Sequence, residues 1–210
     1  MITLCPSKAV ASVETPWWRA LEAHVPRTVR SVAIIALCAI AAAVSAQNRV
    51  SEYAVKAAYL FNFGRFVRFA PSDAVNNRRT FDICIVGEDP LGLALDDLTA
   101  NERLDGKPVR VARMKTAGEA RTCAIAYISS AEGAHVRTDL DALRGLPVLT
   151  VSDSANFLQH GGMIQFVIIG NHVRFAVNLD AVRSAQINLS SELLKVAVSV
   201  NGETPAGVRP

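Results

Sequence analysis

The sequence predicts a single α/β domain. A mixed, mostly parallel sheet is flanked by helices in a three-layer arrangement, with a β-hairpin and a terminal helix near the C-terminus. Half of the residues are hydrophobic and 20% are charged, which is typical of a globular chain. Short apolar runs with strand character alternate with helix-like segments, an order that favours a parallel sheet covered on both faces. A two-residue turn, Gly170-Asn171, joins two alternating segments and predicts the hairpin.

The first 46 residues form an N-terminal extension that ends in a predicted signal peptide. Arg27 and Arg30 precede an apolar run of about 13 residues, and small residues then lead to a cleavage site after Ala46. The run is shorter than the roughly 18 to 20 residues that span a bilayer, although an uncleaved anchor is the alternative. We therefore expect a periplasmic domain over residues 47–200, not inserted in the membrane after cleavage, and a flexible tail over 201–210.

The charge of the expected mature domain argues against nucleic-acid binding. The whole chain has 22 basic and 19 acidic residues, and the first 46 residues contain four and two of these. The remaining 164 residues therefore hold 18 basic and 17 acidic groups, a net charge of +1. Nucleic-acid binding needs a dense basic surface that neutralises phosphates, which a nearly neutral domain does not supply.

Hydrophobic periodicity and turn residues predict the order of helices and strands. The first helix is apolar around most of its circumference, so it must be covered on more than one side. Asp89 is expected to cap the second helix, with Pro90 at its first position. In chain order we expect a helix (51–69), a strand (81–86), a helix (89–98), a strand with a turn at Asp105-Gly106 (104–114), a strand (123–128), a helix (131–143), a strand (147–151), the hairpin (163–178), a helix (178–185) and a last helix (190–199).

The turn at Gly170-Asn171 also fixes the register of the hairpin. Counting outward from a two-residue turn pairs Ile168 with Val173, and the same count continues along both strands. One face is then wholly apolar and the other is mixed. The apolar pairs are Ile168 with Val173, Phe166 with Phe175 and Ile164 with Val177; the mixed pairs are Ile169 with His172, Val167 with Arg174 and Gln165 with Ala176.

Two cysteines, Cys84 and Cys123, remain after the predicted cleavage. An even number of cysteines in an exported domain predicts one disulfide, and two buried free thiols are the alternative. No CxxC motif is present, which argues against a thiol oxidoreductase or a cysteine zinc site.

No catalytic or cofactor-binding motif stands out in the mature sequence, so we expect no enzyme, no cofactor and no metal site. Ser152-Asp153-Ser154 follows a strand and is better explained as the cap of a helix. Gly161-Gly162 lacks the Lys and Ser/Thr of a phosphate-binding loop. His135, His160 and His172 have no metal-ligand spacing, and Asp96-Asp97 is expected to be solvated surface.

Four stretches together resemble the YfiR-like family of periplasmic proteins. They are EYAVKAAYLFNFGRFVRF (52–69), FDICIVGEDPLG (81–92), GMIQFVIIGNHVRFAVNLDAV (162–182) and LSSELLKVA (189–197). The resemblance covers nearly all of residues 51–199, and the VRFAVNLDA stretch is its most specific part.

The resemblance implies a homodimeric inhibitor that binds the periplasmic part of a membrane-bound diguanylate cyclase. Such binding lowers cyclic di-GMP signalling and biofilm formation. Cys84 and Cys123 match the family's first cysteine pair. Leu158 and Gln165 occupy the positions of a second pair found in the best-known member, so a structural role for the remaining bond is favoured over redox control.

Four basic residues are candidates for the partner-binding surface. They are Arg65 and Arg68 on the first helix, and His172 and Arg174 on the mixed face of the hairpin. Interfaces are enriched in arginine and aromatic anchors, although for each of these residues taken alone ordinary solvated charge is slightly favoured. The alternative function is a small-ligand sensor, with a site at the carboxyl ends of strands near Gly87-Glu88-Asp89 and Ser152-Asp153.

Overall fold

The computed structural model describes residues 52–133 and 135–200. The predicted signal peptide and the C-terminal tail lie outside these residues. The first described helix occupies residues 52–66. The elements after it are β1 (Val67–Phe69), α2 (Asp73–Asn76), β2 (Phe81–Val86), α3 (Gly92–Thr99), β3 (Arg103–Leu104), β4 (Lys107–Met114), η2 (Ala117–Ala120), β5 (Ile125–Ile128), η3 (Ser130–Glu132), α4 (Val136–Leu143), β6 (Leu149–Ser152), β7 (Ile164–Ile169), β8 (His172–Val177), α5 (Leu179–Ser184), β9 (Ile187–Leu189), α6 (Ser191–Val196) and β10 (Ser199–Val200).

An eight-stranded sheet forms the centre of the domain, and its strand order is β10-β8-β7-β6-β5-β2-β4-β3. Strands β4, β2, β5, β6 and β7 are parallel, whereas β3 is antiparallel to β4 and β8 is antiparallel to β7. Strand β10 pairs parallel with β8. The parallel strands follow the 2-1-3-4-5 order of a doubly wound sheet, in which the chain reverses direction across the sheet between β2 and β5. The predicted α/β fold with a mostly parallel sheet is confirmed.

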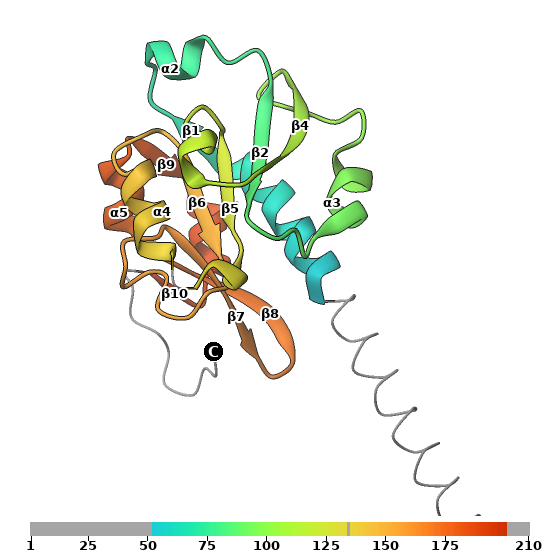
Figure 1. Ribbon diagram of the computed structural model, residues 1–210, viewed down its shortest axis with the longest axis vertical. Helices are drawn as coiled ribbons and strands as arrows, with labels where there is room; N and C mark the ends of the chain where they lie inside the picture. Colours follow the sequence, from blue (N-terminus) through green and yellow to red (C-terminus); the bar gives the residue numbers. More distant parts are fainter. Residues whose placement is uncertain (1–51, 134, 201–210) are drawn as a thin grey trace, which may run out of the picture. The chain divides into compact units, whose positions relative to one another are not determined.

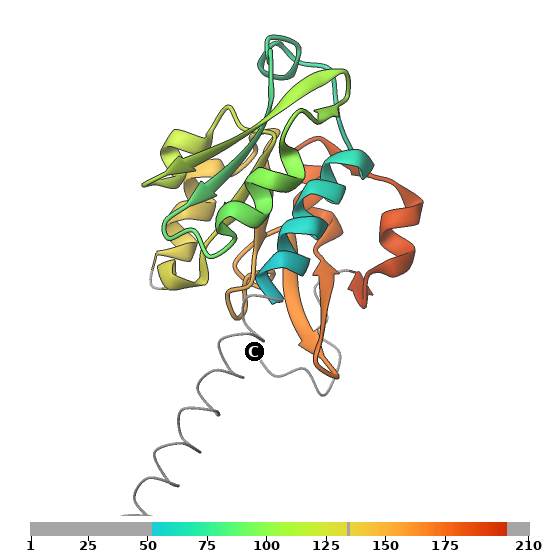
Figure 2. The ribbon, with the colours of Figure 1, turned by 90° about the vertical axis from the view of Figure 1, so that its right-hand side faces the viewer.

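Helices cover both faces of the sheet, which gives the predicted three layers (Figure 1, Figure 2). The first helix, α3, α5 and α6 pack on one face, where Leu60, Phe63 and Phe175 belong to the larger apolar cluster. On the other face α4 and η2 cover a smaller cluster that includes Cys84 and Leu140. The first helix buries residues on several sides, as its nearly uniform apolar surface requires. None of the helices in the two described stretches is long and apolar enough to cross a membrane.

The hairpin has the predicted register along its whole length. Ile168 lies opposite Val173, and the other five predicted pairs also match. Gly170 and Asn171 both have positive φ values, +55° and +62°, as the primed two-residue turn requires. The hairpin extends from the sheet next to the first helix (Figure 2).

The first predicted helix is too long at its C-terminal end. It ends at residue 66, and Val67–Phe69 instead forms β1, which pairs antiparallel with β9 in a separate two-stranded sheet. Residues 67–69 contain a valine and a phenylalanine, which suit a strand, and a partner 120 residues away in the sequence supplies the pairing.

Other helix boundaries also differ from the prediction. Asp89 does not cap a helix starting at Pro90: its Oδ1 accepts bonds from the backbone N–H groups of Leu91 and Gly92, at 2.9 Å each, and α3 begins only at Gly92. The predicted helix over 131–143 is shortened to α4, Val136–Leu143. The last helix, α6, ends at Val196, because the chain then turns back to the sheet as β10.

The predicted cap at Ser152-Asp153-Ser154 is wrong. Residues 155–160 form turns, and the connection from β6 to β7 contains no helix. Ser152 is buried, and its hydroxyl donates to the Ile128 carbonyl at 2.6 Å and accepts from the Ser154 N–H at 3.0 Å. These bonds hold the end of β6 against β5, and a helix cap is not needed to explain the serine.

Candidate functional site

A groove between the first helix and the hairpin brings two of the four predicted partner-binding residues together. Its volume is about 280 Å³. The first two turns of the helix form one wall, and the turn and first residues of β8 form the other. The lining residues are Glu52, Val55, Tyr59, Ile168, Asn171, His172, Val173 and Arg174.

Aromatic packing fixes the helix wall of the groove to the hairpin. The Tyr59 ring meets the Phe175 ring edge-on, with 5.6 Å between ring centroids, and lies 6.1 Å from the Phe166 ring. Val55, in the helix wall, keeps 41% of its surface exposed, and Ile169, next to the groove-lining Ile168 but outside the lining itself, keeps 36%. Exposed apolar side chains around a fixed groove are features of a protein-binding surface.

His172 and Arg174 give the hairpin side of the groove a basic character. Both side chains are exposed, and neither forms an ion pair with a described residue. His172 Nδ1 lies 2.7 Å from the Gly170 carbonyl oxygen, which orients the ring beside the turn. The carboxylate of Glu52 in the opposite wall is bound by Lys56 at 2.6 Å, so its charge is already paired within the chain.

The structure does not place Arg65 and Arg68 at this groove. Arg65 lies 13 residues after Glu52 along the same helix, which corresponds to roughly 20 Å at 1.5 Å per residue. Its guanidinium lies 3.9 Å from Glu102 and 5.0 Å from the centre of the Phe61 ring. Arg68, on β1, donates to the carbonyls of Arg65 and Val67. The four predicted residues therefore do not form one surface.

A buried polar network holds the helix wall in place. Lys56 is only 3% exposed, and its ammonium group lies 2.6 Å from both Asp153 Oδ2 and Glu52 Oε1. Tyr127 donates from its hydroxyl to Asp153 Oδ1 at 2.9 Å. Sequence reasoning missed this role of Lys56, because its partner Asp153 lies 97 residues further along the chain.

The network also fixes the protonation of its members. Burial acts to lower the pKa of Lys56, but the hydrogen bonds and charges of Asp153 and Glu52 outweigh it, so the pKa rises above the ordinary 10.5. Burial, together with the neighbouring Asp153 carboxylate, raises the pKa of Tyr127 well above its ordinary value. Lysine is therefore charged and tyrosine neutral at physiological pH, and both donate hydrogen bonds to the carboxylate.

Two of the three acidic residues near the predicted ligand site, Asp89 and Asp153, are engaged within the chain, whereas Glu88 is exposed. Asp153 is bound by Lys56 and Tyr127. Asp89 accepts two backbone bonds and also pairs with Arg113 at 2.8 Å. Arg113 in turn binds Asp96 at 2.7 Å, so Asp96 contributes to an ion-pair network at the surface.

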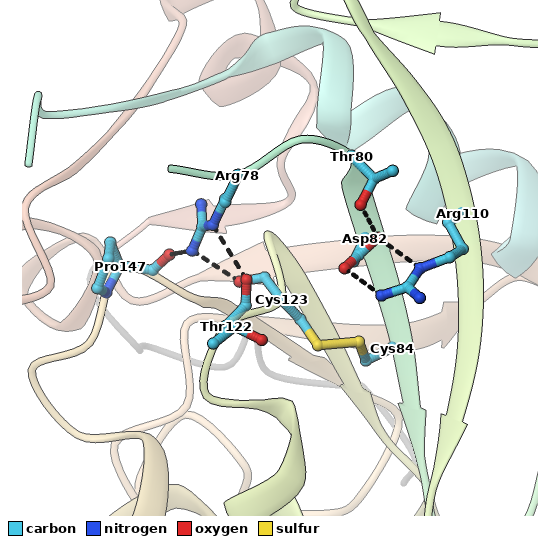
Figure 3. Close-up of a disulfide and its surroundings, with 8 residues drawn as sticks. All are labelled: Arg78, Thr80, Asp82, Cys84, Arg110, Thr122, Cys123 and Pro147. Carbon is cyan, nitrogen blue, oxygen red and sulfur yellow. Dashed lines mark hydrogen bonds and ion pairs between the residues drawn. A yellow bond between two sulfur atoms is a disulfide. The ribbon is translucent and has the colours of Figure 1, made fainter. Parts of the chain in front are cut away.

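The predicted disulfide joins Cys84 in β2 to Cys123, just before β5, two strands that lie side by side (Figure 3). The two cysteines are 0% and 1% exposed. A reductant in solution therefore has little access to the bond in the folded protein. This location favours a structural role.

Charged side chains on both sides of the disulfide bind neighbouring backbone and carboxyl groups (Figure 3). Arg78 donates to three carbonyls, those of Thr122, Cys123 and Pro147, at 3.1, 2.8 and 2.6 Å. It thereby ties the segment before β2 to the start of β5 and β6. Arg110 on β4 forms a bidentate ion pair with Asp82 on the neighbouring β2, at 2.9 and 2.7 Å.

Comparisons with known proteins point to one family. A family model described as YfiR/HmsC-like matches residues 53–198. No curated protein matches the chain. A crystal structure described as a conserved domain protein from Vibrio cholerae is similar at 10% identity, over 61% of this chain and 56% of that chain, with a TM-score of 0.43. The matched part thus spans little more than half of that chain, and a likeness of this size carries no functional argument.

Proposed function

The chain belongs to the YfiR/HmsC-like family, and from this premise we propose that it is a periplasmic regulatory protein. In this proposal it binds the periplasmic part of a membrane-bound diguanylate cyclase and holds the enzyme inactive. The family match over residues 53–198 is the observation that carries the proposal. The protein acts as a homodimer and catalyses no reaction of its own.

A binding protein inhibits an enzyme by preferring its inactive conformation. A preference of about 2–3 kcal/mol shifts the conformational equilibrium of the cyclase by roughly 30- to 150-fold. A contact surface of ordinary size and quality is sufficient for such a preference. We assign this contact to the helix–hairpin groove, because it combines a fixed aromatic wall with exposed apolar and basic side chains.

Export supports the same proposal. The signal peptide predicted up to Ala46 would deliver the domain to the compartment in which Cys84 and Cys123 oxidise. Mass spectrometry of the protein from a periplasmic extract tests this step, since cleavage after Ala46 predicts a chain that begins at Gln47. A full-length protein found in the membrane fraction would contradict it.

The interaction itself is tested by co-purification. The tagged protein is expressed with a membrane-bound diguanylate cyclase that has a periplasmic domain, and the detergent-solubilised complex is isolated on the tag. We expect the intact cyclase to be retained and a cyclase lacking its periplasmic domain to be lost. Equal recovery of both forms, or of neither, would contradict the proposal.

A second candidate function, a small-ligand sensor, is favoured by a larger cavity between α4 and α5. This cavity has a volume of about 480 Å³, within the range of small-molecule sites. Leu140 and Met163 supply apolar surface, and Arg144, His160 and Asn178 supply polar groups. A thermal-shift screen with periplasmic metabolites tests it, because a ligand that binds only the folded state raises the melting temperature.

A further inference from the structure

Strand β8 has an edge that the sheet leaves partly unpaired. In a hairpin with a two-residue turn, the residues that flank the turn exchange hydrogen bonds, and every second pair after them does so too. The bond from the Asn178 N–H to the Met163 carbonyl, at 2.8 Å, fits this pattern. Even-numbered residues of β8 therefore bond to β7, and Val173, Phe175 and Val177 direct their backbone groups to the opposite edge.

Strand β10 pairs with the far half of this edge, and within the described residues no strand pairs with the half next to the turn. Strand β10 pairs only with Ala176 and Val177, and the Val198 N–H donates to the Phe175 carbonyl at 2.9 Å. Among the described residues, none bonds to the Val173 N–H, and the Val173 carbonyl has only a 3.5 Å contact with Arg174 Nη1. Val173 lines the helix–hairpin groove, so this open stretch of strand borders a preformed cavity.

The two faces of the hairpin define what a strand added at this edge must carry. Val173 and Ile168 lie on the face beneath the first helix, where Val55 and Tyr59 complete an apolar wall. His172 and Arg174 lie on the opposite face, exposed and without ion-pair partners among the described residues. Side chains alternate along a strand, so an added strand would direct every second side chain to the apolar wall and the others to the two basic groups.

We infer that the open edge of β8 at Val173 binds an extended segment of the partner, which adds a strand to the sheet and alternates apolar with acidic side chains. Its backbone bonds to the N–H and C=O of Val173. Its apolar side chains enter the groove beside Val55 and Tyr59, and its carboxylates pair with His172 and Arg174. This inference rests on the proposed function for the identity of the partner, but the binding chemistry is independent of that identity.

A second copy of the chain fits this edge less well. Antiparallel pairing of two β8 edges about a two-fold axis through Val173 would place Arg174 of each copy beside His172 of the other. That arrangement gives the Arg174 guanidinium no carboxylate partner, whereas an opposite-charge pair across two strands stabilises their pairing. The charge of the edge therefore selects an acidic partner strand.

The test uses the purified protein and an eight-residue probe peptide that alternates glutamate with valine. Two further peptides serve as controls: one has lysine in place of glutamate, and one has methylated amides on the edge that would face β8. We expect the acidic peptide to bind and to slow hydrogen exchange at the Val173 amide. Each control peptide should bind about tenfold more weakly, because it loses either the ion pairs or the backbone bonds.

Variants of the protein locate the binding. Arg174→Glu should lower the affinity for the acidic peptide about tenfold. Arg79→Glu, a matched charge reversal at another exposed arginine, should leave the affinity unchanged. Val173→Pro removes the N–H that points away from β7 and leaves the bonds between β7 and β8 intact. It should therefore also weaken binding of the acidic peptide. Circular dichroism and the urea midpoint establish that each variant is folded.

The inference is overturned if the acidic peptide does not bind, if the lysine peptide binds equally well, or if Arg174→Glu and Arg79→Glu behave alike. Failure of the cyclase to co-purify while the peptide binds at Val173 would instead overturn the proposed function alone. If the Arg174→Glu variant retained the cyclase as well as the wild type does, the β8 edge would not be the docking site for the cyclase.

Discussion

Lys56 Nζ donates to Asp153 Oδ2 at 2.6 Å, and this contact ties the helix wall of the groove to the carboxyl end of β6. The two side chains are 4% and 9% exposed, so the Asp153 charge is compensated by Lys56, and the Lys56 charge by Asp153 together with Glu52. Because Val55 and Tyr59 flank Lys56 on the same helix, the buried pair also determines the position of the groove-lining residues. Stability and partner binding are therefore coupled through this pair.

Replacing Lys56 alone should be strongly destabilising. Lys56→Met leaves the Asp153 carboxylate buried with only the Tyr127 hydroxyl as a partner, and the removal of one member of a buried ion pair typically costs about 3–5 kcal/mol. Urea denaturation measures the loss, with Lys195→Met, at an exposed lysine, as the control. The double variant Lys56→Met with Asp153→Asn should regain part of the stability, and a purely additive double variant would show that the two residues are not coupled.

Loss of the disulfide should lower the stability of the domain by about 4 kcal/mol, the value expected from the chain entropy of a loop closed over 39 residues. The measurement compares the urea midpoints of the wild type and of Cys84→Ala with Cys123→Ala. Thiol titration of the native protein should find no reactive thiol at either cysteine, and dithiothreitol should reduce the bond much faster in urea than in buffer. Rapid reduction in the folded state would contradict a structural role and favour redox control.

The ion pair of Asp82 with Arg110 predicts a loss of stability in acid. Burial acts to raise the pKa of Asp82, but the hydrogen bonds from Arg110 and Thr80 outweigh it and hold the pKa below the ordinary 3.8. A group whose pKa is lower in the folded state stabilises the fold above its unfolded pKa, and this contribution disappears as the pH falls through the folded value. The wild type should be more stable than Asp82→Asn at pH 7, and the difference should shrink below about pH 4.

Urea midpoints measured from pH 7 to pH 3 test this dependence. The control is Asp97→Asn, at an exposed carboxylate of α3 that has no ion pair within the described part of the chain. A difference between wild type and Asp82→Asn that stays constant over the whole pH range would contradict the assignment.

Gly162 is required by packing in the connection between β6 and β7. A Cβ atom at this position would lie 2.2 to 2.7 Å from three carbons of the Phe157 ring, which is fully buried. Gly162→Ala should therefore destabilise the protein by roughly 1–3 kcal/mol, the usual cost of overpacking. Gly118→Ala is the matched control, since its nearest neighbour would be 3.9 Å away. Equal thermal melting temperatures for the two variants would show that Phe157 moves aside without cost.

Local patterns were sufficient to predict the central part of the fold. The turn at Gly170-Asn171 and the alternation on each side fix the hairpin register, because a shift by one residue would expose Val173 and Phe175 to solvent. Residue type alone predicts a cap at Asn178 or Asp180 and another at Ser190. The structure places them at Asn178 and Ser190, whose side-chain oxygens accept from the backbone N–H groups of Ala181 and Leu193.

Features that depend on distant residues were not predictable from local sequence. Strand β1 exists because Val67–Phe69 pairs with Ile187–Leu189, and Lys56 is buried because Asp153 reaches it from β6. For the candidate site, the sequence identified His172 and Arg174 but grouped them with Arg65 and Arg68, which lie towards the opposite end of the first helix. The open edge at Val173 appears only once β10 is known to stop beside Ala176.

The most direct test of the account is the cellular level of cyclic di-GMP. Deletion of the gene should raise the nucleotide above the wild-type level, and expression of the exported protein should restore it. The Arg79→Glu protein should also restore it, whereas Arg174→Glu should do so only in part. An unchanged nucleotide level after deletion, in a strain that expresses the cognate cyclase, would contradict the central claim that this protein inhibits a diguanylate cyclase.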